Sequence, residues 1–249
     1  NPRYFGLLLD FLRTVNTEEK FSWPSAESAG DEQQAVEGLL READFFKVRA
    51  LRDMLIASRK PLLDSAILSV DDTHRLFKLC KFKRGSKWRL LYRASRDGFG
   101  SERFHERCDG APRTLTVVKT SENGYVFGGY TEKAWSSSGA WSHDPNAFIF
   151  SLVNREKKPM RFMCASGGRE AIYSNRECGP TFGAGYDLAV CIEANAHPRR
   201  CRSLGCTARS SIRVPPSQSS DVEQEKLNTL LAGTFSFRVA ELEVFQKLD

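Results

Sequence analysis

Residues 114–130, TLTVVKTSENGYVFGGY, form the stretch that decides the fold. Two runs of β-branched and aromatic residues flank the polar tetrapeptide Ser121-Glu-Asn-Gly124. Asn-Gly readily adopts the positive φ angles that a tight turn between antiparallel strands requires. The stretch therefore predicts a β-hairpin.

Five further runs of the same kind follow Lys87, separated by glycine, asparagine and serine. They are WRLLYRA, AFIFSLV, RFMCAS, YDLAVCI and FSFRVAELEVF. With the two hairpin runs they make seven short strands, a pattern typical of an antiparallel β-sandwich or barrel. We interpret the Ser- and Pro-rich segment 209–225 as an exposed loop.

The first part of the chain has a helical pattern instead. Apolar residues recur at helical spacing over 2–14 and over 31–55, with a break expected near Phe46-Lys47. We therefore divide the chain into a helical segment (1–57), a linker (58–64) and a β-rich domain (65–249). The predicted fold class is α+β: a two-sheet antiparallel sandwich with peripheral helices, preceded by the helical segment.

The glycine pair Gly128-Gly129 raises the alternative of a phosphate-binding loop. Such a loop needs glycines between a strand and a helix, so that backbone N–H groups converge on the anion. Here TEKAWSSS follows, without an amphipathic helix or a Gly-Lys-Ser/Thr sequence. We interpret the pair, and the related Gly183 and Gly185, as structural positions where a strand bends or another backbone comes close.

Composition indicates an ordinary globular protein, with 249 residues, 41% hydrophobic and 27% charged. No window approaches the roughly 18 apolar residues of a membrane span. The seven cysteines (80, 108, 164, 178, 191, 201 and 206) form no tight framework. They predict reduced thiols and a cytoplasmic compartment. Because the first residue is Asn1 rather than methionine, we expect natural sequence upstream, either a complete domain or a targeting peptide.

The net charge of +6 is concentrated in residues 75–96, which contain nine basic residues and no acidic one. Lys81, Lys83, Arg84 and Lys87 are the candidate partner-contact residues in this tract. Such a tract attracts nucleic acid, anionic lipid or an acidic protein surface. The simpler alternative is a solvated edge beside buried apolar residues.

Aromatic residues interleave with these charges, as in proteins that bind single-stranded nucleic acid by stacking. Phe82, Trp88 and Tyr92 alternate with leucines, however, as core residues would. We therefore do not favour a nucleic-acid ligand.

Metal binding is not favoured either. Cys191, His197, Cys201 and Cys206 lie close in sequence, but their spacing matches no standard pair of zinc ligands. We expect no metal and no cofactor.

Catalysis has only weak candidates. Ser136–Ser138 lie near His143 and Asp144, but no G-x-S-x-G motif is present. Glu241 and Glu243 share one face of a predicted strand, where two solvent-facing glutamates on an edge strand are the commoner arrangement. We expect no enzyme; the alternative is one that depends on a cysteine or on these carboxylates.

Five stretches in the order of the chain resemble the TLDc domain of the eukaryotic oxidation-resistance proteins. They are residues 88–110, 114–141, 144–152, 171–190 and 239–245, with FGGYT and DPNAFIFSL as the most distinctive parts. The resemblance implies a two-sheet sandwich without a known cofactor or established catalytic residues. It also implies a link to oxidative-stress resistance and, as in several family members, binding to the vacuolar proton-pumping ATPase. The Arg- and Cys-rich loop AHPRRCRSLGC (196–206) departs from the family pattern.

The helical segment has a second likeness. NPRYFGLLLDFLRT and EGLLREADFFKVRALRDML are similar to the second half of a BTB domain of the potassium-channel tetramerisation type. This implies self-association, and an alternative function as an oligomeric adaptor for a cullin ubiquitin ligase.

Overall fold

A computed structural model of the protein describes residues 2–14, 29–58, 61–83, 85–163, 169–191, 193–196 and 229–249. The chain divides into two compact units, Asn1–Pro61 and Leu62–Asp249, each described here by itself. Several positions considered above lie outside the described residues: Arg84, Cys164, His197, Cys201, Cys206 and the predicted loop 209–225.

The first unit consists of three helices, α1 (Pro2–Thr14), α2 (Ala29–Phe45) and α3 (Arg49–Ser58). The predicted break near Phe46-Lys47 is confirmed, since Lys47 adopts a left-handed φ of 59° between α2 and α3. The helices bury a small core of their own, formed mainly by Leu8, Phe11, Val36, Leu39, Leu40, Ala43, Leu51 and Leu55.

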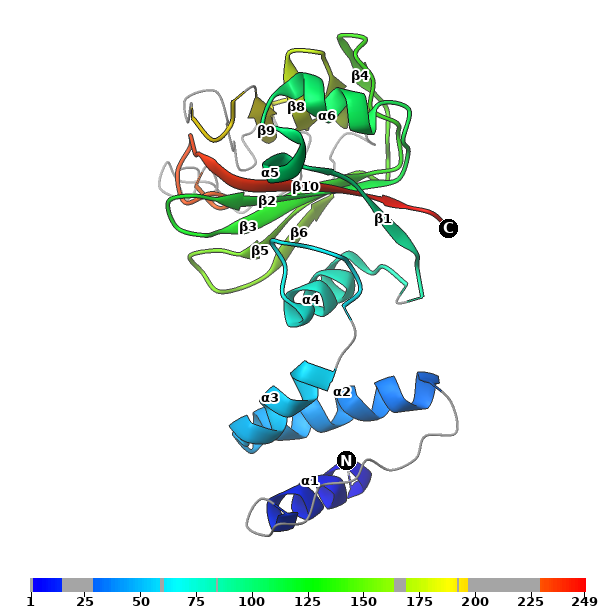
Figure 1. Ribbon diagram of the computed structural model, residues 1–249, viewed down its shortest axis with the longest axis vertical. Helices are drawn as coiled ribbons and strands as arrows, with labels where there is room; N and C mark the ends of the chain where they lie inside the picture. The colour runs from blue at the N-terminus through cyan, green and yellow to red at the C-terminus, as the bar shows by residue number, and fades with distance from the viewer. Residues whose placement is uncertain are drawn as a thin grey trace, which may run out of the picture. The chain divides into compact units, whose positions relative to one another are not determined.

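The second unit contains two antiparallel sheets, which confirms the predicted α+β sandwich (Figure 1). The six-stranded sheet has the order β1-β10-β2-β3-β5-β6. Its strands are β1 (Trp88–Arg93), β10 (Val239–Lys247), β2 (Thr114–Thr120), β3 (Val126–Thr131), β5 (Phe148–Val153) and β6 (Met160–Met163). The four-stranded sheet consists of β4 (Ala140–Ser142), β7 (Ile172–Ser174), β8 (Cys178–Phe182) and β9 (Leu188–Cys191).

The hairpin and the other predicted strands are confirmed. Strands β2 and β3 pair from Thr114 with Thr131 to Lys119 with Val126, and Gly124 in the turn has a φ of 67°. All seven predicted runs contain a strand, whereas β4, β7 and β8 were not predicted. Strand β10 is the exception in topology, because it lies between β1 and β2 and not at an edge.

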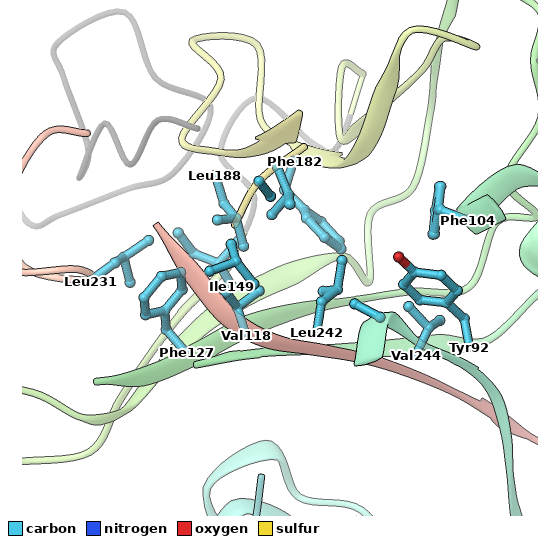
Figure 2. Packing of buried hydrophobic residues seen from close by; sticks show 14 of the residues in the cluster. Tyr92, Phe104, Val118, Phe127, Ile149, Phe182, Leu188, Leu231, Leu242 and Val244 are labelled. Atoms are coloured by element: carbon cyan, nitrogen blue, oxygen red, sulfur yellow. The ribbon is translucent and has the colours of Figure 1, made fainter. Parts of the chain in front are cut away.

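The main core fills the space between the two sheets (Figure 2). Val118, Phe127, Ile149, Leu242 and Val244 face it from the six-stranded sheet. Phe182, Leu188 and Val190 face it from the four-stranded sheet. Each fully buried side chain of this kind contributes about 1.5–3 kcal/mol, so this layer supplies much of the stability of the domain.

The opposite face of the six-stranded sheet is covered by helix α4 (Val70–Cys80) (Figure 1). Leu76 and Phe77 pack there against Leu115, Val117 and Phe150 in a second core. The sequence pattern did not predict this helix, although Ser69 and Asp72 form a capping box at its start. Two shorter helices, α5 (Ala94–Asp97) and α6 (Ser101–Cys108), follow β1.

The glycine pair lies in the middle of β3, with each glycine facing one of the two cores. A Cβ on Gly129 would lie 2.7 Å from the ring of Phe182, which comes from the four-stranded sheet. A Cβ on Gly128 would overlap the carbonyl oxygen of Thr116 on β2 and approach the ring of Phe150 at 2.9 Å. Both positions therefore accommodate neighbours that a side chain would displace.

The second glycine pair has a different setting, since residues 183–186 form the turn between β8 and β9 and not a bend within a strand. Gly183 has a φ of 79°, and its carbonyl accepts a hydrogen bond from the Tyr186 N–H at 2.8 Å. A Cβ on Gly183 would overlap the buried carboxylate of Asp187. The conformation and the crowding both require glycine at position 183, and Gly185 lies in the same turn.

Replacing Gly128 by alanine should destabilise the domain by about 3 kcal/mol or more, because the overlapping atom belongs to a backbone held in the sheet. Chemical denaturation followed by tryptophan fluorescence would measure the change. Gly85→Ala is the matched control, since nothing lies within 4 Å of its Cβ position, and it should shift stability by no more than about 0.5 kcal/mol. Equal effects of the two substitutions would contradict the assigned packing.

Candidate functional site

The predicted partner-contact lysines lie on the loop that joins α4 to β1. Lys81 ends α4 in the left-handed conformation (φ 58°), and its N–H donates to the carbonyls of Phe77 and Lys78. The side chains of Lys81, Lys83 and Lys87 are exposed. We call these three residues the basic loop.

An aromatic cluster anchors the basic loop to the domain. The ring of Phe82 lies 5.0 Å from that of Trp88 and 5.1 Å from that of Tyr130. Phe77 completes the cluster from α4 at 5.6 Å from Phe82. The aromatic residues of the basic tract therefore pack into the domain, while its lysines face solvent.

The C-terminus runs beside the same loop. The carbonyl of Lys87 accepts a hydrogen bond from the Leu248 N–H at 2.8 Å, and the Lys87 N–H donates to the Asp249 carboxylate at 3.3 Å. Arg89, also exposed, donates to the Gln246 side chain at 2.8 Å. These contacts hold the end of the basic loop against the edge of the sheet.

The two glutamates of β10 differ from the expected solvent-facing pair. Glu243 is fully buried, because β10 is an interior strand and the segment before α4 lies against this carboxylate. Glu241 is half-buried and accepts a hydrogen bond from the Ser95 N–H at 3.1 Å. The expectation of an edge strand was wrong.

The Glu243 carboxylate joins three segments of the domain. It accepts from the Ser65 hydroxyl at 2.5 Å and from the Ala66 N–H at 2.8 Å, and it pairs with the Arg93 guanidinium at 2.7 Å. Arg93 also donates to the carbonyl of Asp64 at 2.9 Å. Strand β10, strand β1 and the segment before α4 are therefore fixed to one another through this buried charge.

The suggested Ser, His and Asp residues are not assembled into a triad. Both oxygens of the buried Asp144 carboxylate accept local hydrogen bonds, from the Thr131 hydroxyl at 2.7 Å, the Glu132 N–H at 2.6 Å and the Asn146 N–H at 3.0 Å. His143 is exposed beside it. Asp144 therefore fixes the connection between β3 and β5 through these hydrogen bonds.

A buried histidine on α6 was not predicted as a structural residue. His105 Nδ1 lies 2.7 Å from the Asp109 carboxylate, and Nε2 lies 2.8 Å and 2.9 Å from the carbonyls of Asn175 and Cys178. Both ring nitrogens of this buried side chain therefore lie within hydrogen-bonding distance of oxygen acceptors. The contacts attach α6 to the beginning of β8.

An aromatic patch lies on the outer side of the four-stranded sheet. The ring of Trp141 lies 4.9 Å from Tyr173 and 5.7 Å from Tyr186, and all three residues are partly or largely exposed. The alternation of buried and exposed residues in β7 places Tyr173 on this face. Because Trp141, Tyr173 and Tyr186 are far apart in sequence, the sequence pattern did not predict this patch.

The second unit, with its two sheets and flanking helices, matches a known protein family. Residues 62–247 match the TLDc domain. The chain belongs to the TLDc family. The family match includes α4, which lies before the first resembling stretch, and the whole of β10.

Two further properties of this TLDc protein bear on its chemistry. Within the described ranges, no group of three or more His, Cys, Asp or Glu side chains is arranged to hold a metal ion. Among the same residues, no helix combines the length and apolar character needed to cross a bilayer.

Removing the charge of Glu243 in the TLDc domain should cost about 3–5 kcal/mol of stability, because Arg93 would keep its charge in a largely buried position. Denaturation of Glu243→Gln would measure this loss. Glu106→Gln is the control, since Glu106 forms an exposed ion pair with Arg103, and it should leave stability nearly unchanged. A Glu243→Gln protein as stable as the control would show that the buried pair does not hold the three segments.

Proposed function

We propose that this protein is a non-enzymatic interaction module that binds a larger protein assembly through its TLDc domain. The observation that carries the proposal is the basic loop, with exposed Lys81, Lys83 and Lys87 next to a cluster of buried and partly buried aromatic rings. Such a positively charged surface attracts an acidic protein.

Two buried carboxylates support the same interpretation. Glu243 and Asp144 accept hydrogen bonds from the domain itself. Their oxygens are therefore engaged in holding strands and loops together, which favours display of a surface over acid–base chemistry.

Membership of the TLDc family suggests the class of partner. Its members are linked to oxidative-stress resistance, and several bind the vacuolar proton-pumping ATPase. We propose this ATPase as the assembly that the protein binds or regulates, from the cytoplasm. The basic loop would face an acidic surface of the assembly.

Reversing the charge of the loop, with Lys81→Glu, Lys83→Glu and Lys87→Glu together, should weaken binding to purified vacuolar ATPase by at least roughly tenfold. Biolayer interferometry at increasing salt would measure the effect, and wild-type affinity should fall as salt rises because exposed charges are screened.

The matched control reverses the exposed Lys133, Lys157 and Lys158, which lie on other loops. This control changes the net charge by the same amount as the loop variant, and it should retain most of the wild-type affinity for the ATPase. The absence of wild-type binding would overturn the proposed partner. Equal losses in both triple variants would overturn the assigned surface.

A second candidate function follows from the helical unit, for which we propose self-association through a BTB-like surface, as in an adaptor for a cullin ubiquitin ligase. The supporting observation is a group of exposed aromatic residues. Phe45 is 75% exposed and Phe46 45%, and the ring of Phe46 lies 5.3 Å from that of Phe5. Exposed apolar clusters of this kind are typical of interaction surfaces.

Light scattering of the full chain should detect oligomers that dissociate when Phe45 and Phe46 are both replaced by aspartate. Circular dichroism would verify that the helices remain. Phe235→Asp is the control, because Phe235 is similarly exposed (43%) but belongs to the TLDc domain. A wild-type protein that stays monomeric at high concentration would rule out self-association through these residues.

A further inference from the structure

Two cysteines face each other across neighbouring strands of the four-stranded sheet. Cys178 at the start of β8 pairs in register with Cys191 at the end of β9. Directly opposed residues of antiparallel strands have Cα atoms about 4.5–5.5 Å apart. This separation lies within the range that a disulfide spans, about 4.4–6.8 Å.

Both side chains lie on the same face of the sheet. Leu188 and Val190 point into the core, so the alternation along β9 places Cys191 on the opposite face. Cys178 faces its partner there, and both residues are half-buried cysteines that are not in a disulfide. A small oxidant therefore has access to them, unlike the fully buried Cys80 and Cys108.

The surroundings activate one thiol of the pair. Hydrogen bonding from the Cys191 thiol lowers the pKa of Cys178 to about 7 and outweighs partial burial and the nearby Glu177 carboxylate, which both raise it; His105 adds the smallest lowering effect. Burial has the opposite effect on Cys80 and Cys108 and raises the pKa of each thiol. A lowered pKa favours the thiolate, which is the nucleophilic form of cysteine.

The backbone around Cys178 is also fixed in place. His105 on α6 contacts the carbonyl of Cys178 at 2.9 Å, and the Cys178 N–H donates to the carbonyl of Asn175 at 2.9 Å. The two sulfur atoms therefore meet without a large rearrangement of the strands, as a reversible cross-link requires.

We propose that Cys178 and Cys191 form a redox-active dithiol that reduces a hydroperoxide and closes into a cross-strand disulfide. This site is independent of the basic loop and of the binding proposed above.

The reaction has two steps. The Cys178 thiolate attacks one hydroperoxide oxygen, the O–O bond breaks, and the departing alkoxide takes up a proton to leave as the alcohol. The Cys191 sulfur then attacks the resulting sulfenic acid: the S–S bond forms, the S–O bond breaks, and hydroxide leaves with the Cys191 proton as water. The dithiol loses two electrons and the hydroperoxide gains two. A cellular thiol reductant would restore the dithiol.

Treatment of the full chain with hydrogen peroxide, followed by alkylation and mass spectrometry, tests the proposal. Because no Lys or Arg lies between residues 177 and 198, trypsin leaves both cysteines on one fragment. Further cleavage before Asp187 should yield two peptides joined by a Cys178–Cys191 disulfide, which dithiothreitol separates. The wild-type chain and a variant with Cys164, Cys201 and Cys206 replaced by serine should give the same product.

Two single variants assign the roles of the thiols. In Cys191→Ser the sulfenic acid on Cys178 should persist and be trapped by dimedone, whereas in Cys178→Ser oxidation of Cys191 should be roughly tenfold slower. Pairing of Cys178 with any other cysteine, or equal trapping with and without Cys191, would overturn the proposal. Failure of the folded wild-type chain to form the disulfide would do the same.

Discussion

The contact between Gly129 and the ring of Phe182 is the constraint on which the sandwich depends. The ring lies directly on the backbone of β3, where a Cβ would be only 2.7 Å away. Phe182 in turn meets Trp135 edge-on at 5.5 Å, and Trp135 meets Phe104 of α6 at 5.4 Å. A continuous series of rings therefore connects the six-stranded sheet, the four-stranded sheet and α6, and it begins at a position without a side chain.

Buried polar contacts also join distant segments of the domain. Glu243 and His105 are both buried, and each joins segments that are distant in sequence. Their hydrogen-bonding capacity is used within the fold, which leaves the surface to carry function. Two regions of that surface differ in chemistry: the basic loop displays positive charge, and the four-stranded sheet displays aromatic rings and a pair of thiols. The two proposed activities, partner binding and a response to oxidants, therefore lie on separate regions of one domain.

Much of the fold could be predicted from local patterns, because its longer strands are continuous β-branched and aromatic runs. Strands β4 and β7 have only three residues each, and β8 contains Gly179 and Pro180, so these strands have no such pattern. The candidate site was harder to predict. Glu243 contacts Ser65 across 178 residues of chain, and the pairing of Cys178 with Cys191 depends on strand register. The start of helix α4 does have a recognisable sequence pattern, the capping box of Ser69 and Asp72.

The position of β10 has a consequence for how the protein is made. This strand follows all the other described strands in the chain, yet it lies between β1 and β2, and its Phe245 belongs to the core beneath α4. Until Val239–Lys247 leaves the ribosome, β1 and β2 each have an unpaired edge, a state that favours aggregation. Contacts of such long sequence separation also slow folding. The sheet of the nascent domain therefore keeps exposed strand edges until β10 is available to pair with both neighbours.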